Sequence, residues 1–189
     1  MFKAKVIGEG LTADQIAELK SICAEVAQLA HKAATTAVGD RAKWFGKMAN
    51  SKDVTDGLKR MDEYLDRQCI QLNFVRKNTG QIVDQVPAED SDYGQVIPNI
   101  AQTTAQFRKA PAHVSSGLRI FAMNEIINAI KNNDRVEKLN YVYHEISHKV
   151  LGTVDYKYGA SACEKLALDA PGQAVRNADN WGYFIAGVK

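Results

Sequence analysis

The residues of this chain best suited to chemistry are two histidines and a glutamate near its C-terminal end, His144, Glu145 and His148. On a helix, side chains four residues apart project from the same face, so both imidazoles could reach one metal ion. That spacing suits Zn²⁺, which binds imidazole nitrogens at about 2.0–2.1 Å. Glu145 is rotated by roughly 100° around the helix, off the metal but within reach of a water bound to it. The pattern therefore predicts a zinc site with an adjacent general base.

A catalytic zinc takes three protein ligands plus water, so two histidines leave such a site one ligand short. Gly152 follows His148 by four residues and favours a helix stop in a left-handed turn. The chain can then return beside the metal, where Asp155 would offer a carboxylate oxygen, an acceptable zinc ligand. Tyr158 follows three residues later, and its phenol could hydrogen-bond the oxyanion of a tetrahedral intermediate. Without this continuation the histidine pair would be a weak signal.

Helices must present these residues, and the spacing of apolar side chains predicts several of them. Thr12 and Gln15 have the spacing of a capping box at the start of the first helix. Pro171 suits the first turn of the last one. The predicted helices run over Thr12–Val38, Asp53–Gln68, Asp134–Val150, Ser161–Leu168 and Pro171–Ala186, with a short element at Arg41–Gly46.

Between the second and third helices the sequence favours strands. Apolar and polar residues alternate over Ile70–Phe74, a turn-forming run follows at Asn78–Gly80, and apolar residues resume at Ile82–Val83, a pattern that predicts a β-hairpin. Leu118–Ala122 is predicted to be a further strand, and residues 87–115 a loop. The elements together predict a helix-dominated α+β fold with a small sheet.

Composition and charge narrow the possible classes of protein. With 189 residues, 46% hydrophobic and 24% charged, the chain can form one domain with a substantial core. We expect a single domain over residues 1–189, with helices in 1–68, the small sheet and loops in 69–123 and the catalytic helices in 124–189. The net charge of +2 comes from interspersed acids and bases, so no nucleic-acid partner is expected. No apolar run reaches the roughly 18–20 residues of a membrane span.

Two segments carry a resemblance to a known family. They are His144-Glu145-x-x-His148 with Gly152-Thr153-x-Asp155-x-x-Tyr158-Gly159, and the run Asn177–Phe184. Together they resemble the deuterolysin family, the aspzincin metalloendopeptidases, whose name refers to an aspartate as third zinc ligand. The similarity is specific over residues 140–184, whereas the N-terminal half matches only in the order of its elements.

The resemblance implies a zincin-like metalloprotease fold in which the predicted motif helix carries the active site. It implies one zinc ion held by His144, His148 and Asp155, with Glu145 as general base and Tyr158 as a group that stabilises the transition state. An aspartate in the late helix, Asp179 here, has also been considered as third ligand for this family. Asp155 is preferred because the glycine turn directly after the motif helix can deliver it.

The late helix, which contains the run Asn177–Phe184, also bears on which substrate residue is preferred after the cut. In the lysine-specific members of the family, an acidic pair in this helix lines the pocket for the residue after the cut. Asp179 matches the first acid, but Gly182 stands in the place of the second. A preference for lysine after the cut therefore stays open. Trp181, between them, could pack beneath the active site or touch the substrate.

The sequence thus predicts a zinc-dependent endopeptidase that hydrolyses internal peptide bonds with a zinc-bound water activated by Glu145. The protein or peptide substrate would lie along an edge strand, Leu118–Ala122 or part of Ile70–Val86. One alternative is a zinc-binding structural or interaction module without turnover, and another is a metal-free helical interaction domain. The presence of a base, Glu145, and a phenol, Tyr158, beside the ligands favours a catalytic zinc site, because a structural zinc needs neither.

The remaining expectations concern the environment of the protein. Family members are usually secreted, whereas residues 1–10 contain no apolar signal core. We therefore expect a protein that is secreted or exported as an effector, and the chain would be a mature domain, a domain of a larger protein or an effector exported by a leaderless route. Cys23, Cys69 and Cys163 are far apart in sequence. They allow either one disulfide with one free thiol or three reduced thiols. A monomer is expected.

Overall fold

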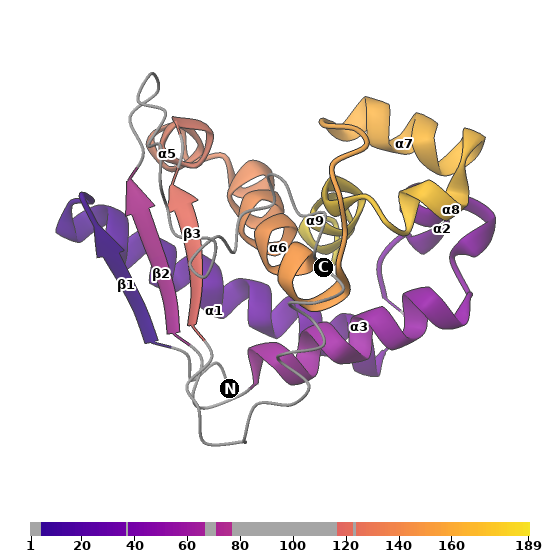
Figure 1. Ribbon diagram of the computed structural model, residues 1–189, viewed down its shortest axis with the longest axis horizontal. Helices are drawn as coiled ribbons and strands as arrows, with labels where there is room; N and C mark the ends of the chain where they lie inside the picture. Colours follow the sequence, from indigo (N-terminus) through magenta and orange to yellow (C-terminus); the bar gives the residue numbers. More distant parts are fainter. Residues whose placement is uncertain (1–4, 37, 67–70, 77–116, 123) are drawn as a thin grey trace.

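The computed structural model describes residues 5–36, 38–66, 71–76, 117–122 and 124–189 (Figure 1). Most of the described residues are helical, which confirms the helix-dominated architecture predicted from the sequence. The helices are α1 (Ala13–Thr35), α2 (Arg41–Phe45), α3 (Lys52–Leu65), α5 (Asn124–Lys131), α6 (Arg135–Leu151), α7 (Ala160–Asp169), α8 (Pro171–Ala174) and α9 (Ala178–Ala186), with a 3₁₀ turn, η1 (Gly46–Met48).

The strands form a three-stranded sheet in the order β1-β2-β3, and both pairs are parallel. They are β1 (Lys5–Glu9), β2 (Gln71–Arg76) and β3 (Gly117–Ala122). β3 contacts α5 and α6 (Figure 1).

The predicted hairpin is wrong for β2, because parallel partners occupy both of its edges. The alternation that identifies a strand does not identify its partner, and a parallel partner needs a long connection rather than a tight turn. The predicted turn Asn78–Gly80, the second arm Ile82–Val83 and the predicted loop over residues 87–115 lie outside the described residues. β1 was not predicted, since its five residues hold only two large apolar side chains, Val6 and Ile7.

The long helix α1 begins as its sequence predicts. The Thr12 side chain accepts a hydrogen bond from the Gln15 N–H, and the Gln15 side chain accepts one from the Thr12 N–H, so the capping box is confirmed. The helix ends at Thr35, three residues before the predicted Val38. Its buried face packs against α3 and α6.

The motif helix α6 lies near the middle of the molecule, between the sheet and α9 (Figure 1). The Asp134 side chain caps its first turn by accepting from the Glu137 N–H. Leu139, Val142 and Ile146 are fully buried in the hydrophobic core. Burial of each such side chain contributes about 1.5–3 kcal/mol, so the core fixes the rotation of α6 about its axis.

The predicted single helix Pro171–Ala186 is wrong, because the structure divides it into α8 and α9. The intervening residues pair with the chain that follows α6. Val154 N–H donates to the Arg176 carbonyl at 2.8 Å, and Ala178 N–H donates to the Val154 carbonyl at 3.1 Å. Backbone groups engaged in this short parallel bridge cannot also continue a helix.

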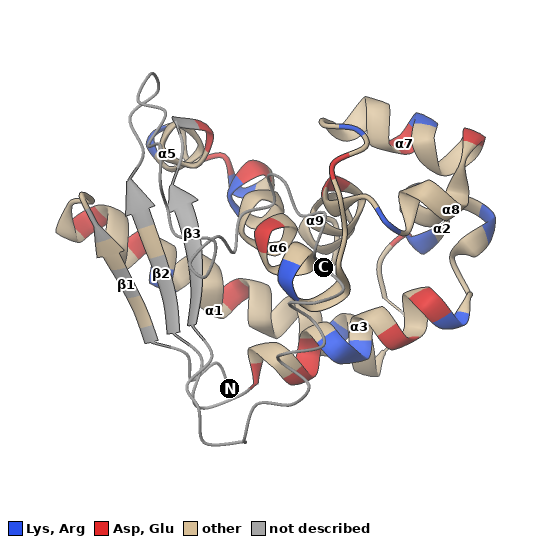
Figure 2. Cartoon of the chain, viewed as in Figure 1, with Lys and Arg blue, Asp and Glu red and all other residues tan. Residues whose placement is uncertain are grey.

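Three further features of the described residues bear on the sequence predictions. Cys23 and Cys163 are buried free thiols, and Cys69 lies outside the described residues. The helices that the structure describes include none with the length and apolar character that a membrane crossing requires. Figure 2 shows acidic and basic residues interspersed along α3.

Candidate active site

The turn that ends α6 brings a carboxylate back to the two histidines. Gly152 adopts a left-handed conformation, with φ 69°, and its N–H donates to the His148 carbonyl. Glycine adopts this conformation without the steric penalty of a Cβ. The reversal places Asp155 beside the face of α6 that carries His144 and His148.

Three candidate ligand atoms meet at this point. The His144 and His148 Nε2 atoms are 3.0 Å apart, and the Asp155 Oδ1 atom lies 3.2 Å from the first and 3.3 Å from the second. Tetrahedral zinc with bonds of 2.0–2.1 Å holds its ligand atoms about 3.3–3.4 Å apart. The three atoms therefore have the spacing of zinc ligands.

The environment of Asp155 gives an independent test of this fit. Its Oδ1 atom is buried and makes no hydrogen bond within the described part of the chain. A buried carboxylate oxygen is costly unless a positive charge compensates its own, and a cation held between Asp155 and the two Nε2 atoms would supply that charge. Two imidazole nitrogens and a carboxylate oxygen form a donor set that Zn²⁺ accepts in catalytic sites.

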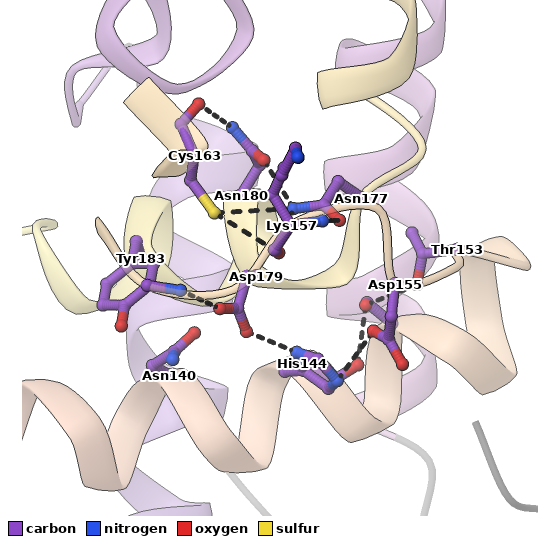
Figure 3. Close-up of polar contacts among 12 residues, drawn as sticks. Asn140, His144, Thr153, Asp155, Lys157, Cys163, Asn177, Asp179, Asn180 and Tyr183 are labelled. Atoms are coloured by element: carbon purple, nitrogen blue, oxygen red, sulfur yellow. Dashed lines mark hydrogen bonds and ion pairs between the residues drawn. The ribbon is translucent and has the colours of Figure 1, made fainter. Parts of the chain in front are cut away.

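The other ring nitrogens of the histidines are fixed by hydrogen bonds, as Figure 3 shows for His144. The His144 Nδ1 atom lies 2.6 Å from the Asp179 Oδ1 atom, and the His148 Nδ1 atom lies 2.9 Å from the Thr153 carbonyl oxygen. The Thr153 hydroxyl also lies 2.8 Å from that of Ser147. The partners of the Nδ1 atoms, a carboxylate and a carbonyl oxygen, accept hydrogen bonds, so each Nδ1 carries a proton and each Nε2 is the atom that would bind a metal.

Asp179 is thus bound to the side of His144 opposite the candidate metal position. Its Oδ2 atom accepts the Gly159 N–H at 2.8 Å, and its side chain is buried. The carboxylate joins α9 to α6 and to the end of the loop after Gly152. The structure does not bring Asp179 into the cluster of Nε2 and Oδ1 atoms.

The electrostatics of the site follow from these contacts. Burial lowers the pKa of His144, but the carboxylates of Asp155 and Asp179 outweigh it and raise the pKa to about 10. Burial raises the pKa of Asp155, yet the two histidines hold it well below its usual range. Burial also raises the pKa of Glu145, the residue next to His144 on α6. A proton on His144 and a charged Asp155 form the pairing that a bound cation would replace.

Tyr158 lies over the site but is open to solvent. Its ring stacks on that of His144, with centroids 6.2 Å apart and an interplanar angle of 18°, and the residue is 65% exposed. Burial of the hydroxyl and a hydrogen bond to Asp155 raise its pKa. An exposed phenol held beside a candidate ligand can turn toward a bound substrate.

The two other predicted substrate residues lie within the packing of α9. Trp181 is 1% exposed, donates its indole N–H to the Val175 carbonyl at 2.8 Å and packs on Phe45. A Cβ at Gly182 would lie 1.9 Å from Asn140 Oδ1 and 2.7 Å from the Asn140 carbonyl oxygen. Gly182 therefore permits close packing of α9 on α6, and neither residue presents a side chain to solvent.

Sequence reasoning assigned no role to Asn177 and Asn180, which the structure places beneath the loop that carries Asp155 and Tyr158. Asn177 Oδ1 accepts the backbone N–H groups of Tyr156 and Lys157. The only available signal was their position in the asparagine-rich run after Arg176.

Comparison with known proteins places the chain in a family. The profile of the aspzincins, described as lysine-specific metallo-endopeptidase, matches residues 29–186. The chain belongs to the aspzincin family. The match begins within α1, so β1 and the part of α1 before residue 29 precede the part of this aspzincin that the profile covers.

Two individual proteins resemble this aspzincin. A stretch of 43 residues is 51% identical to peptidyl-Lys metalloendopeptidase from Armillaria mellea, and it covers 22% of this chain and 12% of that protein. The fold is similar to that of a zinc peptidase from Grifola frondosa, with a TM-score of 0.53 and 20% identity over 93% of this chain and 96% of the other.

Proposed function

We propose that this aspzincin is a zinc-dependent endopeptidase that hydrolyses internal peptide bonds of proteins. The observation that carries the proposal is the meeting of His144 Nε2, His148 Nε2 and Asp155 Oδ1 within 3.0–3.3 Å of one another. These residues would hold one zinc ion and leave a coordination position for water or substrate. When bound, zinc polarises the scissile carbonyl and lowers the pKa of the attacking water.

Glu145 is the general base of this proposal. It would accept the proton of the attacking water and later transfer it to the leaving amine. Its raised pKa supports the assignment, because a carboxylate whose pKa lies nearer neutrality both accepts and returns a proton more readily. Its place one residue after His144 turns it away from the three ligand atoms.

Tyr158 would donate a hydrogen bond to the oxyanion of the tetrahedral intermediate. The exposure of the side chain and its stacking on His144 support this role. Its raised pKa keeps the phenol protonated, as a donor must be, over the whole neutral range. Donors of this kind stabilise the charge that develops in the transition state.

The substrate is proposed to pair along β3, whose outer edge has no partner among the described strands. β3 contacts both α5 and α6, so an extended peptide there would run beside the motif helix. A preference for lysine after the cut is part of the proposal, with Asp179 as its acid. The names of the family and of the Armillaria mellea protein support that preference.

A digest of a denatured protein mixture, with and without chelator, tests the function. Chelator-sensitive cuts are expected, and the residues flanking them give the preference. Glu145→Gln should retain zinc while losing cleavage, because the amide cannot act as base. Zinc binding by the wild type without any cleavage would instead support a structural or interaction module.

A further inference from the structure

The loop between α6 and α7 carries both Asp155 and Tyr158, and one buried side chain holds its middle. Asn177 is fully buried, and its Oδ1 atom accepts the N–H groups of Tyr156 at 2.7 Å and Lys157 at 3.0 Å. Its Nδ2 atom donates to the Lys157 carbonyl oxygen at 3.0 Å (Figure 3). Three backbone groups between Asp155 and Tyr158 therefore depend on one amide.

Asn177 is itself fixed by contacts to other helices. Its Nδ2 atom also donates to Asn180 Oδ1 at 2.7 Å. Asn180 Nδ2 donates in turn to the carbonyl oxygens of Trp44 in α2, at 2.7 Å, and Cys163 in α7, at 3.0 Å. Because Asn180 is also fully buried, the loop is tied to a platform built from α2, α7 and α9.

We propose that Asn177 is a positioning residue of the metal site, which orients Asp155 and Tyr158 without contacting the metal. The inference rests on the zinc site of the proposed function. Asp155 Oδ1 lies at ion-pair distance from both Nε2 atoms, 3.2 Å from that of His144 and 3.3 Å from that of His148. The backbone that carries Asp155 sets where its carboxylate can reach, and the Tyr156 N–H, the next backbone donor along the chain, is bound to Asn177.

The chemistry of the side chain explains why an amide is suited to this place. Two N–H groups need an acceptor, while the Lys157 carbonyl and Asn180 Oδ1 need donors. An amide offers both, whereas a carboxylate accepts only and an alanine offers neither. Outer contacts that orient a metal ligand typically change metal affinity tenfold to a hundredfold when they are removed.

A double-mutant cycle on zinc affinity tests the proposal. The variants are Asn177→Ala, Asp155→Ala and the pair, and the measured quantity is the zinc dissociation constant in competition with a chromogenic chelator. We expect Asn177→Ala to weaken zinc about tenfold to a hundredfold. In the Asp155→Ala background the same change should have less than a roughly twofold effect, because its effect passes through Asp155. Equal losses in both backgrounds would overturn the proposal.

Two further variants separate positioning from general support of the fold. Asn177→Asp keeps the acceptor for both N–H groups and should retain more zinc affinity than Asn177→Ala. Asn128→Ala, a change of the same type at an exposed position on α5, should leave zinc affinity unchanged. A zinc loss in Asn177→Asp equal to that in Asn177→Ala would count against the role of the acceptor.

The readout also distinguishes this inference from the proposed function. If the wild type fails to bind zinc, both are wrong. If it binds zinc and the cycle is additive, only the role of Asn177 is wrong. Absence of peptide cleavage leaves the cycle unaffected, because zinc affinity is measured without substrate.

Discussion

Gly182 is the point at which a single methyl group should disturb both the fold and the metal site. The Cβ of an alanine would lie 2.7 Å from the Asn140 carbonyl oxygen and 1.9 Å from its Oδ1 atom. The side chain can rotate away, but the carbonyl belongs to α6 and cannot. Ordinary C–H···O contacts are about 3.3–3.6 Å, so α9 must move away from α6 by roughly half an ångström or more.

The same displacement reaches the candidate metal ligands. Asp179 lies one turn before Gly182 on α9, and His144 lies one turn after Asn140 on α6. The 2.6 Å contact between Asp179 and His144 should therefore lengthen. We expect Gly182→Ala to lower the free energy of unfolding by about 1–3 kcal/mol, as overpacked cores do. Zinc affinity should fall about tenfold or more through the weakened contact to His144.

Urea unfolding of the zinc-free protein and chelator competition measure these two effects separately. Gly172→Ala is the matched control, because a Cβ at Gly172 meets nothing within 4 Å. It lies in α8, where alanine is favoured over glycine, so this variant should be as stable as the wild type or more stable. The reasoning is refuted if the two alanine variants unfold at the same urea concentration and bind zinc equally.

Three further predictions concern the site itself. Tyr158→Phe should lower kcat by about 10²–10³, as the loss of one oxyanion donor does, while unfolding stays as in the wild type. An unchanged kcat would remove Tyr158 from the mechanism. Asp179→Asn should weaken zinc about tenfold to a hundredfold, because a neutral amide holds the His144 Nδ1 proton less strongly, and chelator competition measures it. Zinc affinity should rise by roughly tenfold per pH unit from neutral pH towards pH 10. The reason is that a pKa of about 10 keeps His144 protonated until zinc binds, and zinc must displace that proton. Calorimetry in buffers of different ionisation enthalpy would detect the released proton.

The features that the sequence predicted well are those set by local chemistry. A threonine and a glutamine three residues apart were enough to locate the start of α1, and Gly152 was enough to locate the end of α6. In both cases a few neighbouring residues satisfy the backbone groups that a helix end leaves free. The approach of Asp155 to His144 and His148 depends on that same turn, so it was accessible to sequence reasoning.

The features that were missed depend on partners far away in sequence. β1 and β3 both pair with β2 in parallel, a register that no local pattern of β2 encodes. The break between α8 and α9 depends on Val154, which pairs with the chain around Asn177. Neither Pro171 nor the apolar residues of α9 reveal that partner. Propensity describes a segment alone, and tertiary contacts can override it.

The two carboxylates of the site are engaged in different ways, and this affects any preference for lysine. Asp179 already accepts from the Gly159 N–H and from His144 Nδ1. Each carboxylate oxygen has a second lone pair, so a substrate ammonium could still be accepted, but only in competition with these contacts. A second acid at position 182 is incompatible with the packing of α9 on Asn140. Any lysine preference that depends on Asp179 is therefore coupled to zinc affinity, because the same carboxylate serves both. A substitution of Asp179 that alters the lysine preference should also alter zinc affinity.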